Sequence, residues 1–305
     1  MLRLEKDPFQ QHFIESNSMP VPFRSKLNAR KLKQGRPTRW PDFIRDDSVR
    51  ATPHSRALAQ RWIPERGFVL IPNPALSEPE DLLHRNRQLD LIDRNTRLFR
   101  DGKPANHALL WGARGTGKSA MVRAMLKRYG GPDLGMIEIA HSSLSELADL
   151  MQILSRVDRR YMLFIDDLSF DAHDARYKGL KALLDGSLLS STHNVVVYAT
   201  SNRRHLLPES MADNLNGRIV DGELHEGDAI DEKISLSERF GLWLAFHPFT
   251  QEQYLDIVSA HLAQAGSSAS DTNWHEEALR FARLRGSRSG RVAMQFVQYW
   301  QSLNV

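Results

Sequence analysis

The chain has 305 residues, of which 41% are hydrophobic and 26% charged, and its formal net charge at pH 7 is +4. It is long enough to bury a sizeable core, and no apolar run approaches the roughly 20 residues that a membrane helix needs. The absence of cysteine excludes disulfides and cysteine-ligated zinc, and the first residues lack the apolar stretch of a secretory signal. We therefore expect a cytoplasmic protein with no membrane partner.

Residues 1–63 are basic and rich in proline. They carry thirteen Lys/Arg and six Asp/Glu, and residues 24–39 include seven basic residues and no acidic one. The prolines interrupt every candidate helix, yet aromatic residues are more frequent than in a disordered tail. We expect an extended arm that lies on a surface. Residues 24–39 could contact a nucleic acid or an acidic protein, and a solvated arm without such a partner is the alternative.

From Pro79 to Phe246, helical and strand-like patterns alternate. Five short apolar segments are predicted to be strands, at Ala108–Trp111, Met136–Ala140, Tyr161–Ile165, Asn194–Thr200 and Leu242–Phe246. Helices are predicted from Leu82 to near Gly102, from Lys118 to about Tyr129, from a capping box of Ser143 and Glu146 to Leu154, before Gly186, and from Ile230 to Phe240. This rhythm is typical of an α/β fold with a parallel five-stranded sheet covered on both faces.

The strand pattern stops after His247 and Pro248, and only helical patterns follow. Three helices are predicted, at Thr250–Ala265, Trp274–Leu284 and Ser289–Leu303. We therefore expect three parts in the chain. They are the N-terminal arm (1–63), an α/β core (64–246) and a small C-terminal helical lid domain (247–305).

The strongest motif is a glycine-rich turn between the first strand and the following helix. It matches the P-loop pattern G-x-x-x-x-G-K-[ST] with the residues Gly112, Ala113, Arg114, Gly115, Thr116, Gly117, Lys118 and Ser119. Glycines let backbone N–H groups approach phosphate oxygens, and the helix that begins here directs its positive dipole end at the same anion. Lys118 would reach the β and γ phosphates, and the Ser119 hydroxyl would ligate magnesium. The motif therefore predicts ATP and Mg²⁺ as ligands.

Polar residues also follow the next strands of the predicted sheet. Asp166 and Asp167 come directly after the strand that ends at Ile165, and Asn202 follows the valine-rich strand. A carboxylate at the carboxyl end of a strand beside a P-loop can hold the magnesium shell, which we assign to Asp166. Asp167 would then orient or deprotonate the attacking water. For Asn202, contact with the γ-phosphate or the water and a plain turn-forming role are equally compatible with the spacing.

Together these motifs resemble the AAA+ superfamily of P-loop ATPases. The resemblance also includes Leu236–Phe240 and the late sequence Ser289–Arg291, and it extends from about Leu82 to Trp300. Longer strings resemble one bacterial family of predicted AAA+ ATPases of unknown cellular function. They are Leu110–Ser119, Asp166–Phe170, Ala199–Glu209 and Arg239–Leu244. The resemblance implies a five-stranded sheet with a helical lid and a nucleotide bound between them and a neighbouring subunit.

Further residue roles follow from the resemblance alone. Asn202 takes the sensor-one position, and Arg239 matches the arginine finger that a neighbouring subunit inserts toward the γ-phosphate. Arg291 matches the sensor-two arginine of the lid, with Arg288 as the alternative. Asp167 stands where many AAA+ proteins have glutamate, and its shorter side chain favours slow hydrolysis. The resemblance thus implies an ATPase that works as a homo-oligomer with shared active sites.

Three kinds of function remain open at this stage. The first is an ATPase that couples turnover to remodelling of an unidentified macromolecular partner. The second is a nucleotide-gated DNA-binding module related to initiators and clamp loaders, and the third is a structural protein that uses ATP only to assemble. The segment Ile139–Leu144 lacks the aromatic-hydrophobic-glycine pore loop of threading unfoldases, and DNA binding would rest on the basic arm alone.

Overall fold

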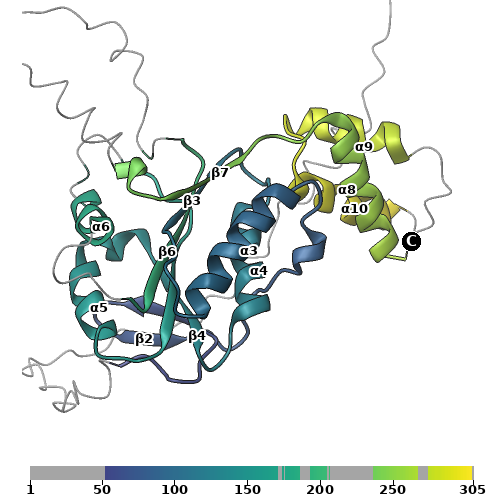
Figure 1. Cartoon of the computed structure of the whole chain (residues 1–305). Helices are drawn as coiled ribbons and strands as arrows, with labels where there is room; N and C mark the ends of the chain where they lie inside the picture. The colour runs from purple at the N-terminus through teal and green to yellow at the C-terminus, as the bar shows by residue number, and fades with distance from the viewer. Residues whose placement is uncertain are drawn as a thin grey trace, which may run out of the picture. The chain divides into compact units, whose positions relative to one another are not determined.

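The computed structural model describes residues 52–170, 174, 176–185, 193–204, 206, 236–266 and 274–303. These residues form a sheet with the strand order β2-β1-β4-β5-β6-β3-β7 and helices on both faces (Figure 1). The strands are β1 (Ala59–Ile63), β2 (Gly67–Leu70), β3 (Ala108–Gly112), β4 (Leu134–Ile139), β5 (Arg160–Ile165), β6 (Val195–Ser201) and β7 (Leu242–Phe246). Among these strands, only β2 runs antiparallel to its neighbour. The mostly parallel α/β architecture expected from the sequence is confirmed, and β3 to β7 match the five predicted strands to within two residues.

Alternate residues of the central strands face two separate hydrophobic clusters. On β5, Leu163 and Ile165 pack in the cluster that contains α5 (Leu147–Leu154) and α6 (Tyr177–Leu184). Met162 and Phe164 of the same strand pack in the cluster that contains α3 (Asn86–Arg100) and α4 (Lys118–Tyr129). Because both faces are covered, β5 is apolar at every position after Arg160, as expected for a buried parallel strand. Figure 1 shows the two helix pairs on opposite sides of the sheet.

The β1–β2 hairpin is an addition to the predicted five-stranded sheet. β1 pairs in parallel with β4, and Arg61 opposite Glu138 forms an ion pair of 3.0 Å across the two strands. β1 lies inside the segment 1–63 that we expected to be an arm, so the predicted core boundary at residue 64 lies too far along the chain. Residues 1–51 of that arm, including the basic stretch 24–39, lie outside the described residues.

Two of the predicted helices begin elsewhere. A short 3-10 helix, η2 (Pro79–Asp81), precedes α3, and His84 has a positive φ of 58°, so Leu82 and Leu83 lie before the helix. The predicted capping box of Ser143 and Glu146 is wrong. Those residues belong to the 3-10 helix η3 (His141–Glu146), and α5 begins after it without a side-chain cap. The helix predicted at 230–240 lies outside the described residues up to residue 235.

The C-terminal helices form the lid, with a hydrophobic cluster of their own. They are α8 (Gln251–Gln264), α9 (Trp274–Leu284) and α10 (Gly290–Leu303), and they match the predicted spans to within one residue. The Thr250 side chain accepts from the backbone of Gln253, whose side chain accepts in turn from the Thr250 N–H. This capping box fixes where the lid begins after β7. Leu83, from the segment before α3, packs against the lid cluster.

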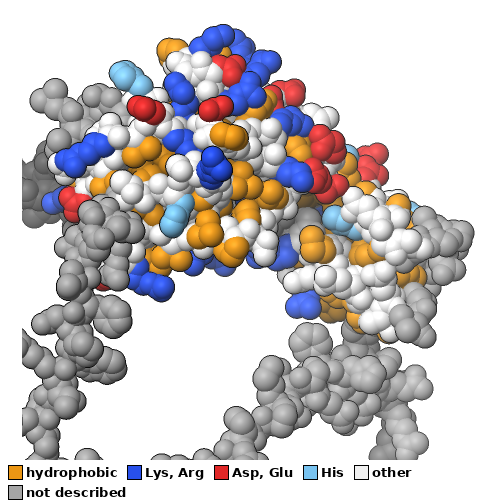
Figure 2. Space-filling view, turned by 90° about the horizontal axis from the view of Figure 1, so that it is seen from below, with side chains coloured by type: hydrophobic (Ala, Val, Ile, Leu, Met, Phe, Trp, Pro, Cys, Tyr) orange, Lys and Arg blue, Asp and Glu red, His pale blue; other side chains and the backbone are white. Residues whose placement is uncertain are grey.

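The surface carries charges of both signs. Figure 2 shows one face on which Lys, Arg, Asp and Glu side chains lie among apolar ones. Ion pairs on this protein's surface include Lys127–Glu78 at 3.2 Å and Arg128–Glu80 at 2.9 Å. Among the described residues, no helix is both long and apolar enough to span a membrane.

Candidate functional site

The glycine-rich turn connects β3 to α4 at the carboxyl edge of the sheet. Three of its residues, Gly112, Gly115 and Gly117, have positive φ values of 132°, 72° and 101°. A Cβ on Gly112 would come within 2.2 Å of the Phe246 carbonyl oxygen on β7, so no other residue can occupy this position without displacing the strand. The sequence thus forms the strand–turn–helix context that a P-loop requires.

Lys118 lies at the first position of α4 and is 7% exposed. Its ammonium group donates to the carbonyl oxygens of Gly112 and Ala113, both at 2.8 Å, and to Asn202 Oδ1 at 3.0 Å. Burial lowers the pKa of Lys118 to about 8, although the carboxylates of Asp167 and Asp166 act in the opposite direction. The lysine is therefore a buried cation that neighbouring oxygens hold in place, and an anion in the turn would stabilise its charged form.

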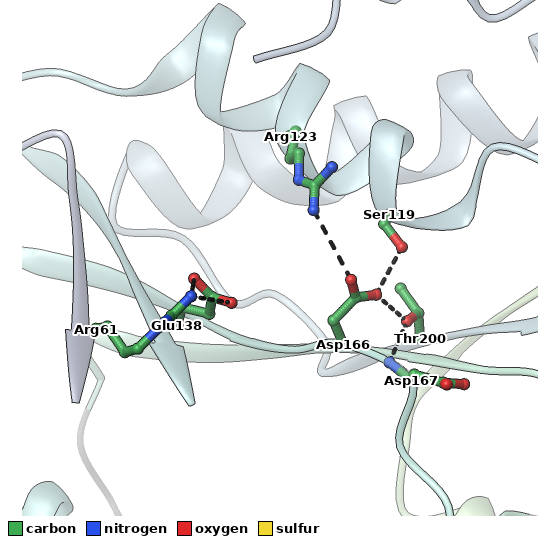
Figure 3. Close-up of polar contacts among 7 residues, drawn as sticks. All are labelled: Arg61, Ser119, Arg123, Glu138, Asp166, Asp167 and Thr200. Carbon is green, nitrogen blue, oxygen red and sulfur yellow. Dashed lines mark hydrogen bonds and ion pairs between the residues drawn. The ribbon is translucent and has the colours of Figure 1, made fainter. Parts of the chain in front are cut away.

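Asp166 follows the last residue of β5 and accepts two short hydrogen bonds. Its Oδ1 atom accepts from Ser119 Oγ and from Thr200 Oγ1, both at 2.6 Å, while Arg123 lies 3.8 Å from Oδ2 (Figure 3). The hydroxyls come from α4 and β6, so three elements meet at this carboxylate. The Arg61–Glu138 pair in the same view lies on β1 and β4, apart from this network.

Asp167 adopts a left-handed backbone conformation with a φ of 53°, which is uncommon for a residue other than glycine. Its backbone N–H donates to Thr200 Oγ1 at 2.9 Å, and its side chain accepts from the Asn202 amide. Figure 3 shows the carboxylates of Asp166 and Asp167 pointing in different directions. Thr200 thus links the two aspartates, and Asn202 links Asp167 to Lys118. Strain of this kind occurs often at functional sites.

A cavity of about 940 Å³ opens beside these residues, within the size range of small-molecule sites. Its lining includes Gly115 to Ser119, Asp166, Asp167 and Asn202, together with Arg291 from the lid. At the lid contact, a Cβ on Gly115 would lie 2.8 Å from Ser289 Oγ and 3.2 Å from Arg291 Cβ. Arg288 lines a neighbouring cavity of about 780 Å³ and is absent from the lining of the first. Of the two lid arginines considered from the sequence, Arg291 is therefore the one at this cavity.

Two residues of the site, Thr200 and Arg85, were not predicted from the sequence. Thr200 stands in a run of strand-forming residues. Its hydroxyl reaches Asp166 and Asp167 only because β6 pairs with β5. Arg85 lines the cavity and donates to the Thr116 carbonyl, 31 positions along the chain, and to the His247 carbonyl, 162 positions along. Burial lowers the pKa of Arg85 to about 10. Contacts between residues so far apart in sequence cannot be found from local patterns.

Arg239 lies apart from the cavity. It follows Leu236–Glu238 and pairs with Asp185, the residue after α6. It is absent from the lining that Lys118, Asp166, Asp167, Asn202 and Arg291 share. Gly112 and Ala113 of the turn are also absent from that lining, but their carbonyl oxygens accept from Lys118, which is part of it. Arg239 is therefore the one predicted site residue that these described contacts do not connect to the cavity.

The donor set at Asp166 suits a hard divalent cation. No cluster of three or more His, Asp or Glu side chains among the described residues could hold a metal by itself. Mg²⁺, however, is commonly held by one or two protein oxygens, with substrate phosphates and waters completing its shell. The Ser119 hydroxyl and the Asp166 carboxylate, 2.6 Å apart beside the glycine-rich turn, are oxygen ligands of this kind.

Comparison with solved structures identifies the fold. A mutant of RuvB from Thermotoga maritima aligns with a TM-score of 0.50 at 15% identity, over 73% of this chain and 63% of that chain. ORC1 from Aeropyrum pernix in complex with DNA gives 0.48 at 17% identity, over 71% and 61%. The FIGL-1 AAA domain in complex with ADP gives 0.43 at 18% identity, over 68% of each chain. The alignment with the RuvB mutant shows that the chain has a RuvB-like AAA+ P-loop fold. The chain spans less than two thirds of the first two of these relatives.

Comparison of the sequence with protein families gives a closer relationship. None of the curated proteins compared matches the chain. One family profile, whose description is "Protein of unknown function (DUF815)", matches residues 55–304. This range contains both strands of the β1–β2 hairpin, the whole site and the lid. The chain therefore belongs to the DUF815 family.

Proposed function

We propose that this protein binds ATP with Mg²⁺ in the cavity beside the P-loop and hydrolyses it slowly. One observation carries the proposal. A buried lysine, a hydroxyl–carboxylate pair and a second carboxylate held by an amide meet around one cavity at the P-loop. These are the groups that phosphoryl transfer to water requires, since its catalysis consists mainly of positioning and charge stabilisation.

Each group has a distinct role in this proposal. Lys118 neutralises the β and γ phosphates, and the backbone N–H groups of the turn bind their oxygens. Ser119 and Asp166 hold Mg²⁺, which offsets phosphate charge. Asp167 orients the attacking water and accepts its proton, and Asn202 fixes that carboxylate through the hydrogen bond between them. Arg291 reaches the phosphates from the lid, which makes the lid position sensitive to the nucleotide.

Arg239 acts in a neighbouring copy of the chain under this proposal, as the arginine finger. Its absence from the lining of the cavity among the described residues supports such a role. A guanidinium group can donate to two phosphate oxygens at once. Arginine fingers of this kind raise the rate of hydrolysis by about 10³–10⁵-fold. The active form is therefore a homo-oligomer with shared sites.

The test uses two inactive variants. Asp167→Asn should keep the affinity for Mg–ATP and lose turnover, because the amide can still accept from Asn202 but cannot take a proton. Arg239→Ala should also bind ATP and hydrolyse it poorly. In phosphate-release assays, a mixture of the two should recover part of the activity, since some interfaces combine an intact finger with an intact carboxylate. No recovery in mixtures that co-assemble would contradict the shared site, and full turnover by Asp167→Asn would contradict the role of Asp167.

Matched control variants distinguish these roles from a general loss of folding. Asp158→Asn changes an exposed carboxylate and should leave turnover unchanged. Asp185→Ala removes one partner of Arg239 within the chain, in an exposed pair worth at most about 1 kcal/mol. If Arg239 acts on a neighbouring site, Asp185→Ala stays active. If Arg239 acts mainly through its pair with Asp185, the two substitutions lower turnover together.

ATP hydrolysis would be coupled to an action of the protein on a macromolecular partner. The basic stretch 24–39, with seven Lys/Arg and no acid, supports an anionic partner such as a nucleic acid or an acidic protein. Binding through this stretch would make the protein a nucleotide-gated module, and the ATPase site proposed above would remain the same in either case.

A further inference from the structure

The segment from Asp81, the last residue of η2, to Arg85, just before α3, connects the core to the lid at several points. Asp81 Oδ1 accepts from Gln264 Nε2 on α8 at 2.9 Å, and His84 Nε2 lies 3.2 Å from Asp256 Oδ2 on the same helix. Leu83 packs against the lid cluster, whereas Leu82 packs against the core cluster of α3 and α4. This short segment is therefore anchored in both domains, although it lies more than 160 residues before the lid.

Arg85 is the most buried charged group of this segment, at 6% exposure. Its Nε donates to the Thr116 carbonyl in the P-loop at 3.2 Å, and its Nη2 donates to the His247 carbonyl at 2.8 Å. Its guanidinium carbon lies 3.9 Å from the centroid of the Phe249 ring. His247 and Phe249 belong to the connector, residues 247–250, which joins β7 to α8. One rigid, planar group thus contacts the P-loop and the connector that carries the lid.

Stability alone does not account for a cation in this position. Among the described residues, the hydrogen-bond partners of Arg85 are carbonyl oxygens, with no carboxylate. Removing a charge from water without a counter-ion is unfavourable, so the two hydrogen bonds and the contact with the Phe249 ring must offset that cost. A methionine would fill much of the same space beside Phe246 and Phe249. What it could not do is hold two carbonyls of different domains in a fixed relation.

We infer that Arg85 is a positioning residue that couples the conformation of the P-loop to the orientation of the lid. This inference rests on the proposed function, since it takes nucleotide in the P-loop as the signal. A nucleotide aligns the turn backbone, and with it the Thr116 carbonyl. Because Arg85 contacts Thr116, His247 and Phe249, a shift of the Thr116 carbonyl displaces the connector residues as well. The lid then moves with the connector. Binding of nucleotide and closure of the lid are then linked equilibria.

The experiment measures hydrogen–deuterium exchange of α8 and α10 with and without Mg–ATPγS. In the wild type, saturating Mg–ATPγS should slow exchange in the lid by about tenfold, roughly the effect of one hydrogen bond to a charged group. Arg85→Met should reduce this response by about threefold, the effect of one hydrogen bond, while exchange in the P-loop still slows. The part that Arg291 conveys directly from the lid should remain. Because coupling is reciprocal, the affinity for Mg–ATPγS should fall by about the same threefold factor as the lid response and no further. Arg87→Ala, an exposed arginine of α3, is the matched control and should behave as the wild type.

A lid response in Arg85→Met as large as in the wild type would overturn the inference. If Arg85→Met does not fold, Arg85→Lys provides the test. A lysine keeps the positive charge but lacks the planar guanidinium group that donates to both carbonyls. Its lid response should be reduced, and an undiminished response would again overturn the inference. A wild type that binds Mg–ATPγS without any response in the lid refutes the coupling alone. A wild type that does not bind Mg–ATPγS refutes the proposed function, and the inference with it.

Discussion

Thr200 is expected to hold both aspartates of the site, and Thr200→Val removes only its hydroxyl. The change costs a hydrogen bond to the charged Asp166 and leaves the Asp167 N–H without its acceptor. A bond to a charged group contributes about 1.5–3 kcal/mol, and the partly exposed Asp167 N–H can turn to water, so the free energy of unfolding should fall by about 1.5–3 kcal/mol. Turnover should fall by about 10–100-fold, because small displacements of reacting groups are costly.

The matched control is Thr96→Val, at a threonine that is also fully buried. Its hydroxyl donates to the Ile92 carbonyl at 2.7 Å and lies 2.8 Å from the Tyr198 hydroxyl, away from the cavity. Urea denaturation should show a loss of stability in both variants, and phosphate release should fall only in Thr200→Val. Equal turnover in the two variants would refute the reasoning, since Thr200 would then be a structural residue and nothing more.

Two further predictions concern charge. Because the pKa of Lys118 in the ligand-free protein is lowered to about 8 and polyphosphate favours the protonated form, the affinity for Mg–ATP should weaken by about twentyfold between pH about 7.5 and about 9.5. Titration calorimetry at the two pH values checks this, and an affinity independent of pH would contradict the interpretation of Lys118 as a buried cation. Removing residues 1–51, which leaves β1 whole, should keep ATP binding and weaken association with DNA or an acidic protein in a salt-dependent manner. Loss of ATP binding on truncation would instead make this segment part of the nucleotide-binding fold.

The core fold could be predicted because its signals are local. β7 and α9 match their predicted bounds, since a short apolar run and a regular apolar face each identify one element. The β1–β2 hairpin was missed because Gln60 and Arg61 break the apolar pattern and because β1 is completed by pairing with the distant β4. The error at Ser143 and Glu146 has a different cause. The spacing of a capping box is present there, but the backbone forms a 3-10 turn first.

The site shows the same division between local and distant information. The P-loop and the aspartates after β5 were predicted from contiguous motifs, and the fold brings them to one cavity. Thr200 and Arg85 were missed because their contacts depend on strand order and on how the connector after β7 meets the core. A threonine in a strand and an arginine before a helix have many ordinary roles, so only three-dimensional contacts distinguish them.

The central claim is that Lys118 and the P-loop bind the phosphates of ATP. The most direct measurement is a calorimetric titration of Mg–ATP into the wild type, Lys118→Ala and Lys127→Ala. Lys127 is on the same helix and forms an exposed ion pair with Glu78, so its loss should have little effect. We expect Lys118→Ala to lose about a hundredfold in affinity, as truncation of a buried charged partner costs about 3 kcal/mol or more. Equal affinity in all three proteins, or no binding by the wild type, would contradict the account.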